Sequence, residues 1–253
     1  MKIPRGHPRF ESLRIRELLV KRLRERIVVP EGLLAHGRGE AFDYLIGERT
    51  NRAAVRALET SAAALLTAKS PVISVNGNTA ALVPRDISKL ASLIPAKVEV
   101  NLFHRSIERE RRIAALLKKY GIRDLLGVGE KASEKIPGIS SRRRMVDPTG
   151  MGSADTIVVP LEDGDRTEAF ARAGKRVIAV DLNPLSRTAR AASITIVDNV
   201  VRAFPGLVVE VRRLKHFSSS RLERIVARFD NAKNLSLALD EMMDYLDGWR
   251  VKA

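Results

Sequence analysis

The sequence predicts an α/β fold in which a doubly wound, mostly parallel, Rossmann-like sheet carries helices on both faces. The composition is the first observation behind this prediction, because 45% of the residues are hydrophobic but only 4% are aromatic. Leu, Ile, Val and Ala must therefore build the core, which favours helices packed on a buried parallel sheet. The second observation is that short apolar runs alternate with amphipathic segments from residue 72 onward. Strands separated by single helices indicate right-handed parallel crossovers.

The chain of 253 residues is long enough for a single α/β domain with helical additions at both ends. We divide it into an N-terminal helical part (1–70), a parallel-sheet core (71–200) and C-terminal helices (201–253). In the N-terminal part, apolar residues at helical spacing predict helices over residues 11–27 and 51–68.

The core and the C-terminal part contain the remaining predicted elements. The predicted strands are residues 72–75, 97–102, 124–128, 156–160, 176–180 and 194–197. The predicted helices are residues 84–93, 106–120, 166–173 and 186–192, followed by one or two helices within 219–247.

Residues 30–40, between the first two predicted helices, contain three glycines among polar residues. Because glycine permits unusual backbone angles, we expect a loop here. Gly37 and Gly39 would let the backbone approach a ligand closely while the guanidinium of Arg38 grips it. A tight loop without a ligand is the alternative interpretation.

Several classes of site are excluded by what the sequence lacks. It has no cysteine, so disulfides, thiolate metal sites and cysteine nucleophiles are excluded. The four histidines lack the spacing of a metal site, and we expect no metal held by the protein alone. No apolar run approaches the roughly 18 residues of a membrane span, so we expect a cytoplasmic protein without a membrane anchor.

The net charge of +15 raises the alternative of a nucleic-acid-binding protein. Residues 1–30 and 212–228 form two basic stretches, and aromatic residues for base stacking are scarce in both. We interpret both stretches as solvated helix faces and do not expect nucleic acid as a partner, although the alternative stays open.

Polar residues follow five of the predicted strands directly. They are Asn76-Gly77-Asn78, Asn101 to Arg105, Glu162 to Thr167, Asp181-Leu182-Asn183 and Asp198-Asn199. Ligands bind beyond the carboxyl ends of parallel strands, so these residues predict a ligand site. A turn or helix cap explains any one of them equally well. The nearby Arg105 and Arg187 add charge that pairs with phosphate and that turns do not require.

The familiar phosphate-binding motifs are absent. No G-x-x-x-x-G-K-[ST] occurs, and no G-x-G-x-x-G follows a strand, which argues against a Walker ATPase or a Rossmann dehydrogenase. Asp181 ends a predicted strand where an acid commonly accepts hydrogen bonds from ribose hydroxyls. Capping of the next helix is an equally good interpretation of this residue.

Four strings carry a resemblance to a known family: HGRGEAFDYL (36–45), VISVNGN (72–78), VPLEDGDRT (159–167) and DLNPLSRTA (181–189). The chain resembles the archaeal phosphopantothenate synthetases, also called 4-phosphopantoate–β-alanine ligases. The similarity spans roughly residues 4–204.

The resemblance implies a homodimeric ligase of coenzyme A biosynthesis. Such an enzyme uses ATP to convert 4-phosphopantoate to an acyl-adenylate with release of pyrophosphate, and transfer to β-alanine then releases AMP. The residues that match the family's ATP contacts are Arg16, Arg38, Asp181, Leu182, Asn183, Arg187, Thr188, Asp198 and Asn199.

A carboxylate attacks an anionic phosphate poorly, so catalysis requires positive charge and positioning. We expect Arg38, Arg187 and Mg²⁺ bound to the nucleotide to supply this charge. Strand-exit position predicts a second set of residues for the acid substrate: Asn76, Asn78, Asn101, His104, Arg105 and Arg166. Of these, His104 with Arg105 or Arg166 is predicted to hold the phosphate of 4-phosphopantoate. A different α/β nucleotide-binding enzyme, such as an NAD-dependent one, is the alternative.

Overall fold

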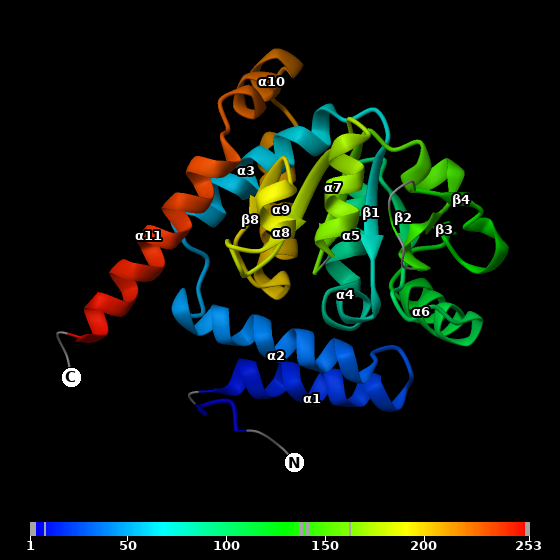
Figure 1. The fold of residues 1–253 in the computed structure, drawn as a ribbon, viewed down its shortest axis with the longest axis horizontal. Coiled ribbons are helices and arrows are strands. Elements are labelled where there is room, and N and C mark those ends of the chain that lie inside the picture. Colours follow the sequence, from blue (N-terminus) through cyan, green and yellow to red (C-terminus); the bar gives the residue numbers. More distant parts are fainter. Residues whose placement is uncertain (1–3, 8, 137–138, 140–141, 162, 251–253) are drawn as a thin grey trace.

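The computed structural model describes residues 4–7, 9–136, 139, 142–161 and 163–250. Its centre is a six-stranded sheet in the order β3-β2-β1-β6-β7-β8, with every neighbouring pair parallel (Figure 1). The strands are β1 (Pro71–Val75), β2 (Lys97–Val100), β3 (Leu125–Leu126), β6 (Thr156–Pro160), β7 (Arg176–Val180) and β8 (Ile194–Ile196). This order, in which the chain winds outward twice from the centre, is Rossmann-like and confirms the predicted fold class. A short antiparallel pair, β4 (Glu134–Lys135) and β5 (Met145–Val146), lies apart from this sheet.

Helices cover both faces because successive strand residues point to opposite sides. On β1, Ile73 and Val75 join the larger apolar cluster, whereas Val72 joins a smaller one on the opposite face. The larger cluster is closed by α3 (Arg52–Thr67), α5 (Pro84–Leu93), α6 (Ile107–Lys119) and α9 (Val200–Leu214). The smaller one receives Phe170 of α7 (Gly164–Arg172), and α8 (Arg187–Ala191) packs beside α7.

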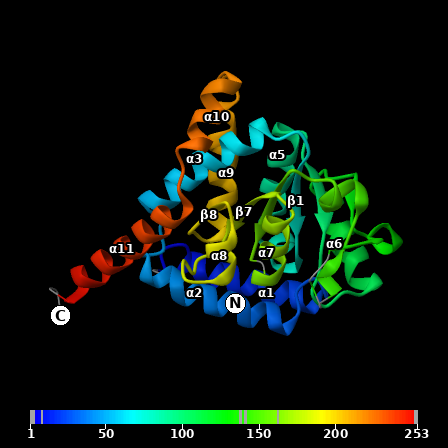
Figure 2. The same ribbon diagram turned by 45° about the horizontal axis from the view of Figure 1, so that its top comes forward.

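The C-terminal part contains more of the core than the boundary at residue 200 suggests. Helix α9 follows β8 directly and buries Phe204, Leu207 and Val211 against α3 and α5. Beyond it, α10 (Ser219–Ala227) packs on α3. The last helix, α11 (Asn231–Arg250), runs outward from the body to the C-terminus (Figures 1 and 2). In the described part of the chain, no helix combines the length and the apolarity that crossing a bilayer requires.

Two N-terminal helices, α1 (Phe10–Arg24) and α2 (Pro30–Leu45), lie side by side across the carboxyl ends of the strands (Figures 1 and 2). Both ends of α2 are tied to the sheet. Near its start, the Nδ2 of Asn78 donates a hydrogen bond of 2.7 Å to the carbonyl of Gly32. Near its end, Asp43 accepts a hydrogen bond of 2.7 Å from the Nδ2 of Asn199.

The predicted loop at residues 30–40 is wrong, because these residues form the first three turns of α2. Pro30 occupies the first helical position and Glu31 the first turn, and both favour a helix start. Its three glycines are not among the residues with left-handed backbone angles. Gly32 instead permits close approach, since a Cβ added there would lie 2.5 Å from the Oδ1 of Asn78. The six-residue helix α4 (Gly77–Leu82), to which Asn78 belongs, was also not predicted.

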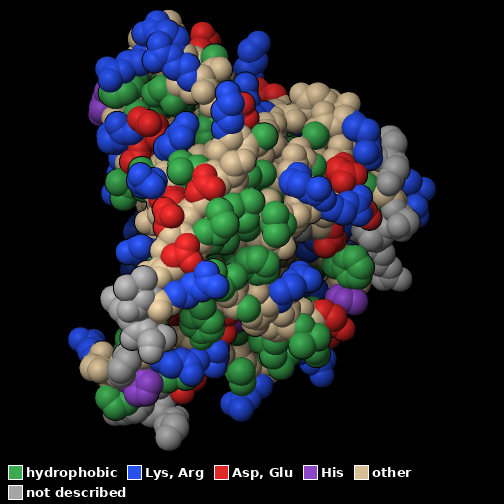
Figure 3. Space-filling view, turned by 60° about the vertical axis from the view of Figure 1, so that its left-hand side comes forward, with side chains coloured by type: hydrophobic (Ala, Val, Ile, Leu, Met, Phe, Trp, Pro, Cys, Tyr) green, Lys and Arg blue, Asp and Glu red, His purple; other side chains and the backbone are tan. Residues whose placement is uncertain are grey.

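The basic side chains do not gather in one stripe on the face drawn in Figure 3, where Asp and Glu are interspersed with Lys and Arg over most of the surface. Many of them form ion pairs. Arg213, for example, lies 2.7 Å from Glu59 and 2.6 Å from Glu210.

Candidate active site

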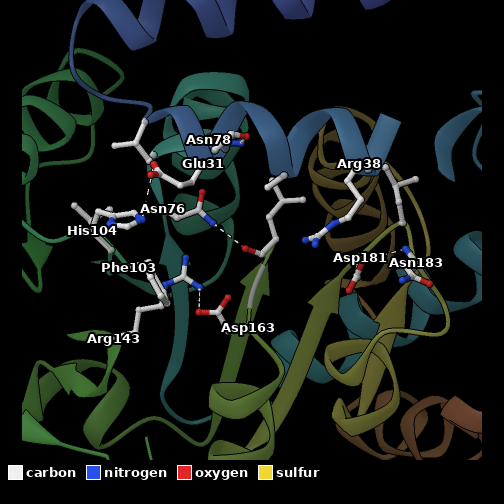
Figure 4. Close-up of a pocket in the computed structure, with 18 of the residues that line it drawn as sticks. Glu31, Arg38, Asn76, Asn78, Phe103, His104, Arg143, Asp163, Asp181 and Asn183 are labelled. Carbon is white, nitrogen blue, oxygen red and sulfur yellow. Dashed lines mark hydrogen bonds and ion pairs between the residues drawn. The ribbon is translucent and has the colours of Figure 1, made fainter. Parts of the chain in front are cut away.

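A cavity opens between α2 and the carboxyl ends of the central strands (Figure 4). Its volume of about 330 Å³ falls within the range of small-molecule sites. The wall is formed by α2, α4 and the segments that follow β2, β6 and β7. A second cavity of about 500 Å³ continues to the first turns of α7 and α8. The two cavities share the residues Arg38, Phe103, Asp163, Asp181 and Asn183.

Sheet order explains where the first cavity lies. β1 and β6 are neighbours, but the chain winds outward from them in opposite directions, which leaves a crevice between their carboxyl ends. Asn76 spans this crevice, because its Nδ2 donates to the carbonyl of Pro160 at 2.9 Å. Its Oδ1 accepts from the amide of Thr79 at 3.0 Å and so caps α4. Asn76 lines the cavity and also holds the two strand exits together.

Arg38 and Asp181 face each other across the wall that the two cavities share (Figure 4). Arg38 is exposed, and among the described residues it makes no hydrogen bond or ion pair. Asp181 is largely buried, and this burial raises the pKa of its carboxyl group. Hydrogen bonds from Ser186 and Asn183 and the charge of Arg38 oppose that rise. The guanidinium of Arg38, which has no bonded anion among the described residues, thus lies beside the carboxylate of Asp181 at the carboxyl end of β7.

The carboxylate of Asp181 organises the turn after β7. Its Oδ1 accepts from the amide of Asn183 at 2.9 Å, and its Oδ2 accepts from the hydroxyl of Ser186 at 2.5 Å. Ser186 is itself the N-cap of α8 and accepts from the amide of Ala189 at 2.9 Å. The interpretation of Asp181 as a direct helix cap is therefore wrong, and Asp181 supports the residue that caps. Leu182, between the two polar residues, is buried and lies in the cavity wall.

Arg187 and Thr188 line the second cavity at the start of α8. The guanidinium of Arg187 lies 2.7 Å from Asp165 and 3.0 Å from Glu168, and its side chain is 57% exposed. Arg187 therefore has two carboxylate partners at the mouth of this cavity, the exposed Asp165 and the half-buried Glu168, whereas Thr188 is buried in its wall.

The far end of the first cavity contains two arginines that strand-exit reasoning missed. Arg109, in the first turn of α6, and Arg143, shortly before β5, line the wall together with Phe103 and His104. His104 is half exposed, and its Nε2 lies 3.8 Å from Glu31 of α2 (Figure 4). Arg143 donates to the carboxylate of Asp163 at 2.9 Å.

The remaining predicted substrate residues are engaged within the protein. Asn78 lines the first cavity and holds α2, while Asn101 is buried and donates to the carbonyl of Met145 at 3.0 Å. Arg105 pairs with Glu110 and donates to the carbonyls of Gly127 and Gly129. Neither Asn101 nor Arg105 lines either cavity.

Arg166 is fully buried at the inner wall of the second cavity. Its Nη2 donates to the hydroxyl of Ser74 at 3.3 Å and contacts the sulfur of Met151 at 2.6 Å. These contacts lie on the face of the sheet covered by α7, so Arg166 contributes to that face as well as to the cavity.

Three residues that match the family's ATP contacts lie outside both cavities and join α2 to its neighbours. Arg16 of α1 pairs with Glu40 of α2 at 2.8 Å. Asp198 and Asn199, after β8, belong to a buried cluster with Asp43 and Arg202. The contacts of this cluster are Arg202 to Asp43 (2.5 Å), Arg202 to Asp198 (2.6 Å), Asn199 to Asp43 (2.7 Å) and Thr50 to Asp198 (2.6 Å).

Comparison with known proteins identifies the family of this fold and site. The family described as phosphopantothenate/pantothenate synthetase matches residues 53–245, well over half of the chain. The chain belongs to the phosphopantothenate/pantothenate synthetase family. Its relatives include a protein of Thermococcus onnurineus strain NA1 that is 50% identical over 247 residues, covering 97% of this chain and 94% of the relative.

Two further relatives of the synthetase family are of similar length and similarity. The protein of Thermococcus kodakarensis is 51% identical over 96% of this chain and 93% of its own length. That of Methanosarcina mazei is 45% identical over 96% of this chain and 95% of its own length. All three are named 4-phosphopantoate–β-alanine ligase. The resemblance carried by the four strings is thereby confirmed, since these matches span nearly the whole chain.

Proposed function

We propose that this synthetase joins 4-phosphopantoate to β-alanine in an ATP-dependent ligation within coenzyme A biosynthesis. The relatives' shared name supports the substrates. The observation that carries the proposal is Arg38, which lies where two cavities meet and has no bonded carboxylate among the described residues. One cavity would take the acid and the other the nucleotide, so that a positive charge lies at their junction.

The reaction that fits this arrangement proceeds through an acyl-adenylate. A carboxylate oxygen of 4-phosphopantoate forms a bond to the α-phosphorus of ATP, the bond from that phosphorus to the bridging oxygen breaks, and pyrophosphate leaves. The ammonium group of β-alanine loses one proton to give the amine, which forms a bond to the acyl carbon. AMP leaves with the electrons of the broken acyl–phosphate bond, and the nitrogen loses a second proton to give the amide. Both substrates of the first step are anionic, so Arg38 would act by lowering their repulsion. Arg187 lines the second cavity, where the phosphates of ATP would lie, and it would exchange one of its carboxylate partners for a phosphate.

The nucleotide would lie along the exit of β7. Asp181 and Asn183 are placed where ribose hydroxyls are held in sheets of this order, and Leu182 and Thr188 complete the adjoining wall. ATP contact by Arg16, Asp198 and Asn199 remains a prediction of the family resemblance, because these residues lie outside the cavities.

Mg²⁺ would accompany the nucleotide. Among the described residues no three histidines or carboxylates are grouped to hold a metal. The second cavity nevertheless offers the carboxylates of Asp163 and Asp165, and Mg²⁺ in nucleotide sites takes one or two carboxylates together with phosphate oxygens. These residues fit the ion and would hold it, and its charge would offset that of the phosphates.

One assay tests the proposal directly. Incubation with ATP, 4-phosphopantoate and β-alanine is expected to yield AMP and pyrophosphate in equal amounts, and omission of β-alanine should halt turnover. Formation of ADP and inorganic phosphate would contradict the adenylate route. If the rate of ATP consumption did not depend on 4-phosphopantoate, the result would favour a different nucleotide-binding enzyme.

The homodimer and the cytoplasmic location also stay predictions. Light scattering of the purified protein checks the homodimer.

A further inference from the structure

Leu161 has a backbone conformation that leucine rarely adopts, because its φ angle of 52° lies in the left-handed region. Among the described residues other than glycine, only Arg26 and Glu48 share this region. Both are exposed and lie in turns just after α1 and α2, where such angles are common. Leu161 instead follows β6, is half-buried and lines the first cavity. Glycine would adopt this angle without strain, so a leucine here indicates that its side chain is needed.

The side chain of Asn76 holds this conformation from the neighbouring strand. Its Nδ2 donates to the carbonyl of Pro160 at 2.9 Å and to that of Leu161 at 3.3 Å. Its Oδ1 accepts from the amide and the hydroxyl of Thr79, both at 3.0 Å. The amide of Leu161 donates to the carbonyl of Val180 at 3.1 Å. Both peptide groups that flank Leu161 are therefore held, and this fixes the direction in which its side chain leaves the backbone.

Leu161 belongs to an apolar part of the first cavity wall. Asn76, which holds it, lies between His104 and Arg38 (Figure 4). Apolar residues line the cavity from α2 and its N-cap on one side and from the strand exits on the other: Val29, Ala35, Phe42, Leu102, Leu161 and Leu182. A wall of this kind suits a ligand that has a compact hydrocarbon part as well as charged groups.

The acid in the proposed reaction has such a part. 4-Phosphopantoate carries two methyl groups on one carbon atom, which lies between its carboxylate and its phosphate. Burial of these methyl groups against apolar side chains would favour binding. Because its backbone is held by hydrogen bonds, Leu161 would offer this apolar surface with little ordering on binding.

We propose that Leu161 packs against the two methyl groups of the acid substrate and selects the branched acid, and that Asn76 is the residue that positions it. This inference rests on the ligase function proposed above and assigns the specificity for the carbon skeleton of the acid. It gives the predicted substrate residue Asn76 an indirect role, since both ends of its amide group are engaged within the protein.

The test compares 4-phosphopantoate with 2,4-dihydroxybutanoate 4-phosphate, which is the same acid without its two methyl groups. kcat/KM is measured with each acid for the wild type and Leu161→Gly. One methylene group in an apolar pocket changes kcat/KM about ten- to two-hundredfold, so the wild type should prefer the branched acid at least about tenfold. Leu161→Gly keeps the left-handed angle but lacks the side chain, and it should reduce this preference to about threefold or less.

Two further variants separate the side chain from the residue that holds it. Leu161→Asn tolerates the same angle and has a similar shape but a polar end, so it should reduce the preference as well, and it replaces Leu161→Gly if that variant does not fold. Asn76→Asp still accepts from Thr79 but cannot donate to the two carbonyls. Its carboxylate repels both anionic acids, so the readout is the ratio of the two kcat/KM values, which should fall.

The matched control is Glu48→Gly, which makes the same backbone change at an exposed residue that lines neither cavity. It should change both kcat/KM values less than about threefold. The strain itself is checked by thermal unfolding. Alanine stays strained at a left-handed angle, so Leu161→Gly should unfold about 2 to 4 °C above Leu161→Ala. Equal Tm values for these two variants would contradict the conformation on which the proposal depends.

Each activity outcome decides a separate question. A wild type that forms no AMP with either acid overturns the ligase proposal itself. An active wild type that does not distinguish the two acids overturns only the role of Leu161. Equal losses on both acids in Leu161→Gly and Leu161→Asn also overturn it, because they indicate a purely structural role. An unchanged ratio in Asn76→Asp overturns the positioning role of Asn76.

Discussion

The hydroxyl of Ser186 links Asp181 to the start of α8, because it donates to the Asp181 carboxylate at 2.5 Å and accepts from the amide of Ala189 at 2.9 Å. The carboxylate proposed to meet the ribose is therefore also part of the capping structure of α8. Any change at Asp181 has two measurable consequences, one in nucleotide affinity and one in stability.

Asp181→Asn is expected to raise KM for ATP about ten- to a hundredfold while lowering kcat less, because ribose contacts change little between bound ATP and the transition state. The matched control is Ser186→Ala, which removes the cap but keeps the carboxylate. This control should cost roughly 1 kcal/mol in the free energy of unfolding and affect KM little. Titration of ATP against both variants, with urea unfolding of each, checks the two effects. Equal KM values for wild type and Asp181→Asn would remove Asp181 from the nucleotide site.

Arg38→Ala is expected to abolish most activity and leave the fold intact. The side chain of Arg38 is exposed, and among the described residues it forms no hydrogen bond or ion pair, so its loss leaves no partner unsatisfied. Tm should change by no more than that of Arg24→Ala, a control at the exposed end of α1. AMP formation and thermal unfolding followed by circular dichroism measure both effects. A large fall in Tm would contradict the catalytic role, as would full activity.

Glu99 is expected to make stability depend on pH. Burial raises its pKa from 4.5 to about 7, although its carboxylate accepts hydrogen bonds from the amides of Asp147 at 2.9 Å and Met151 at 2.6 Å. Since the folded-state pKa exceeds the unfolded value, the folded protein binds the proton more tightly. The stabilising contribution of this group is complete below pH 4.5 and is lost as pH rises through 7.

The comparison of wild type with Glu99→Gln isolates this contribution from other titrating groups. One pKa unit corresponds to about 1.4 kcal/mol, so the wild type should lose roughly 2 to 3 kcal/mol relative to the variant between pH 5 and pH 8. Urea unfolding at each pH provides the values. Parallel stability curves for the two proteins would show that Glu99 does not titrate in this range.

The glycines of α2 provide a prediction about packing. Gly32→Ala would place a Cβ 2.5 Å from the Oδ1 of Asn78, so it should destabilise by roughly 1 to 3 kcal/mol and reduce activity by displacing α2. Gly37→Ala meets nothing within 4 Å and should stabilise the helix by roughly 0.5 to 1 kcal/mol. Unfolding measurements on both variants check this contrast. Similar values for the two would mean that the contact with Asn78 does not position α2.

Local sequence patterns predicted the sheet well because buried parallel strands are short apolar runs, and β6 and β7 have the predicted bounds. The same patterns failed for α2, because glycines lower helix propensity. A glycine is needed at position 32 because of its close contact with Asn78, which the local sequence does not reveal. Pro30 and Glu31 mark the start of α2 locally, but the contacts that stabilise it involve residues far along the chain and have no local signature.

The candidate site was predicted in part for a similar reason. The rule that ligands bind at strand exits led to Asp181 and Asn183, which line both cavities. It could not separate them from Asp198, whose carboxylate is paired with Arg202, a residue that lies four positions later. Arg109 and Arg143 follow no predicted strand directly. In a chain with 45 basic residues, nothing in their sequence context distinguishes them from arginines on the surface.

The buried cluster of Asp43, Arg202 and Asp198 has a consequence for how substrates enter. Swinging α2 away from the sheet would separate Asp43 from both Arg202 and Asn199, and the loss of hydrogen bonds to a charged group costs roughly 1.5 to 3 kcal/mol each. The contact of Gly32 with Asn78 restrains the other end of the same helix. We therefore expect substrates to exchange through the open sides of the cavity while α2, which covers it, stays in place. Ligands meet a preorganised site, and little of their binding free energy is lost to ordering the protein.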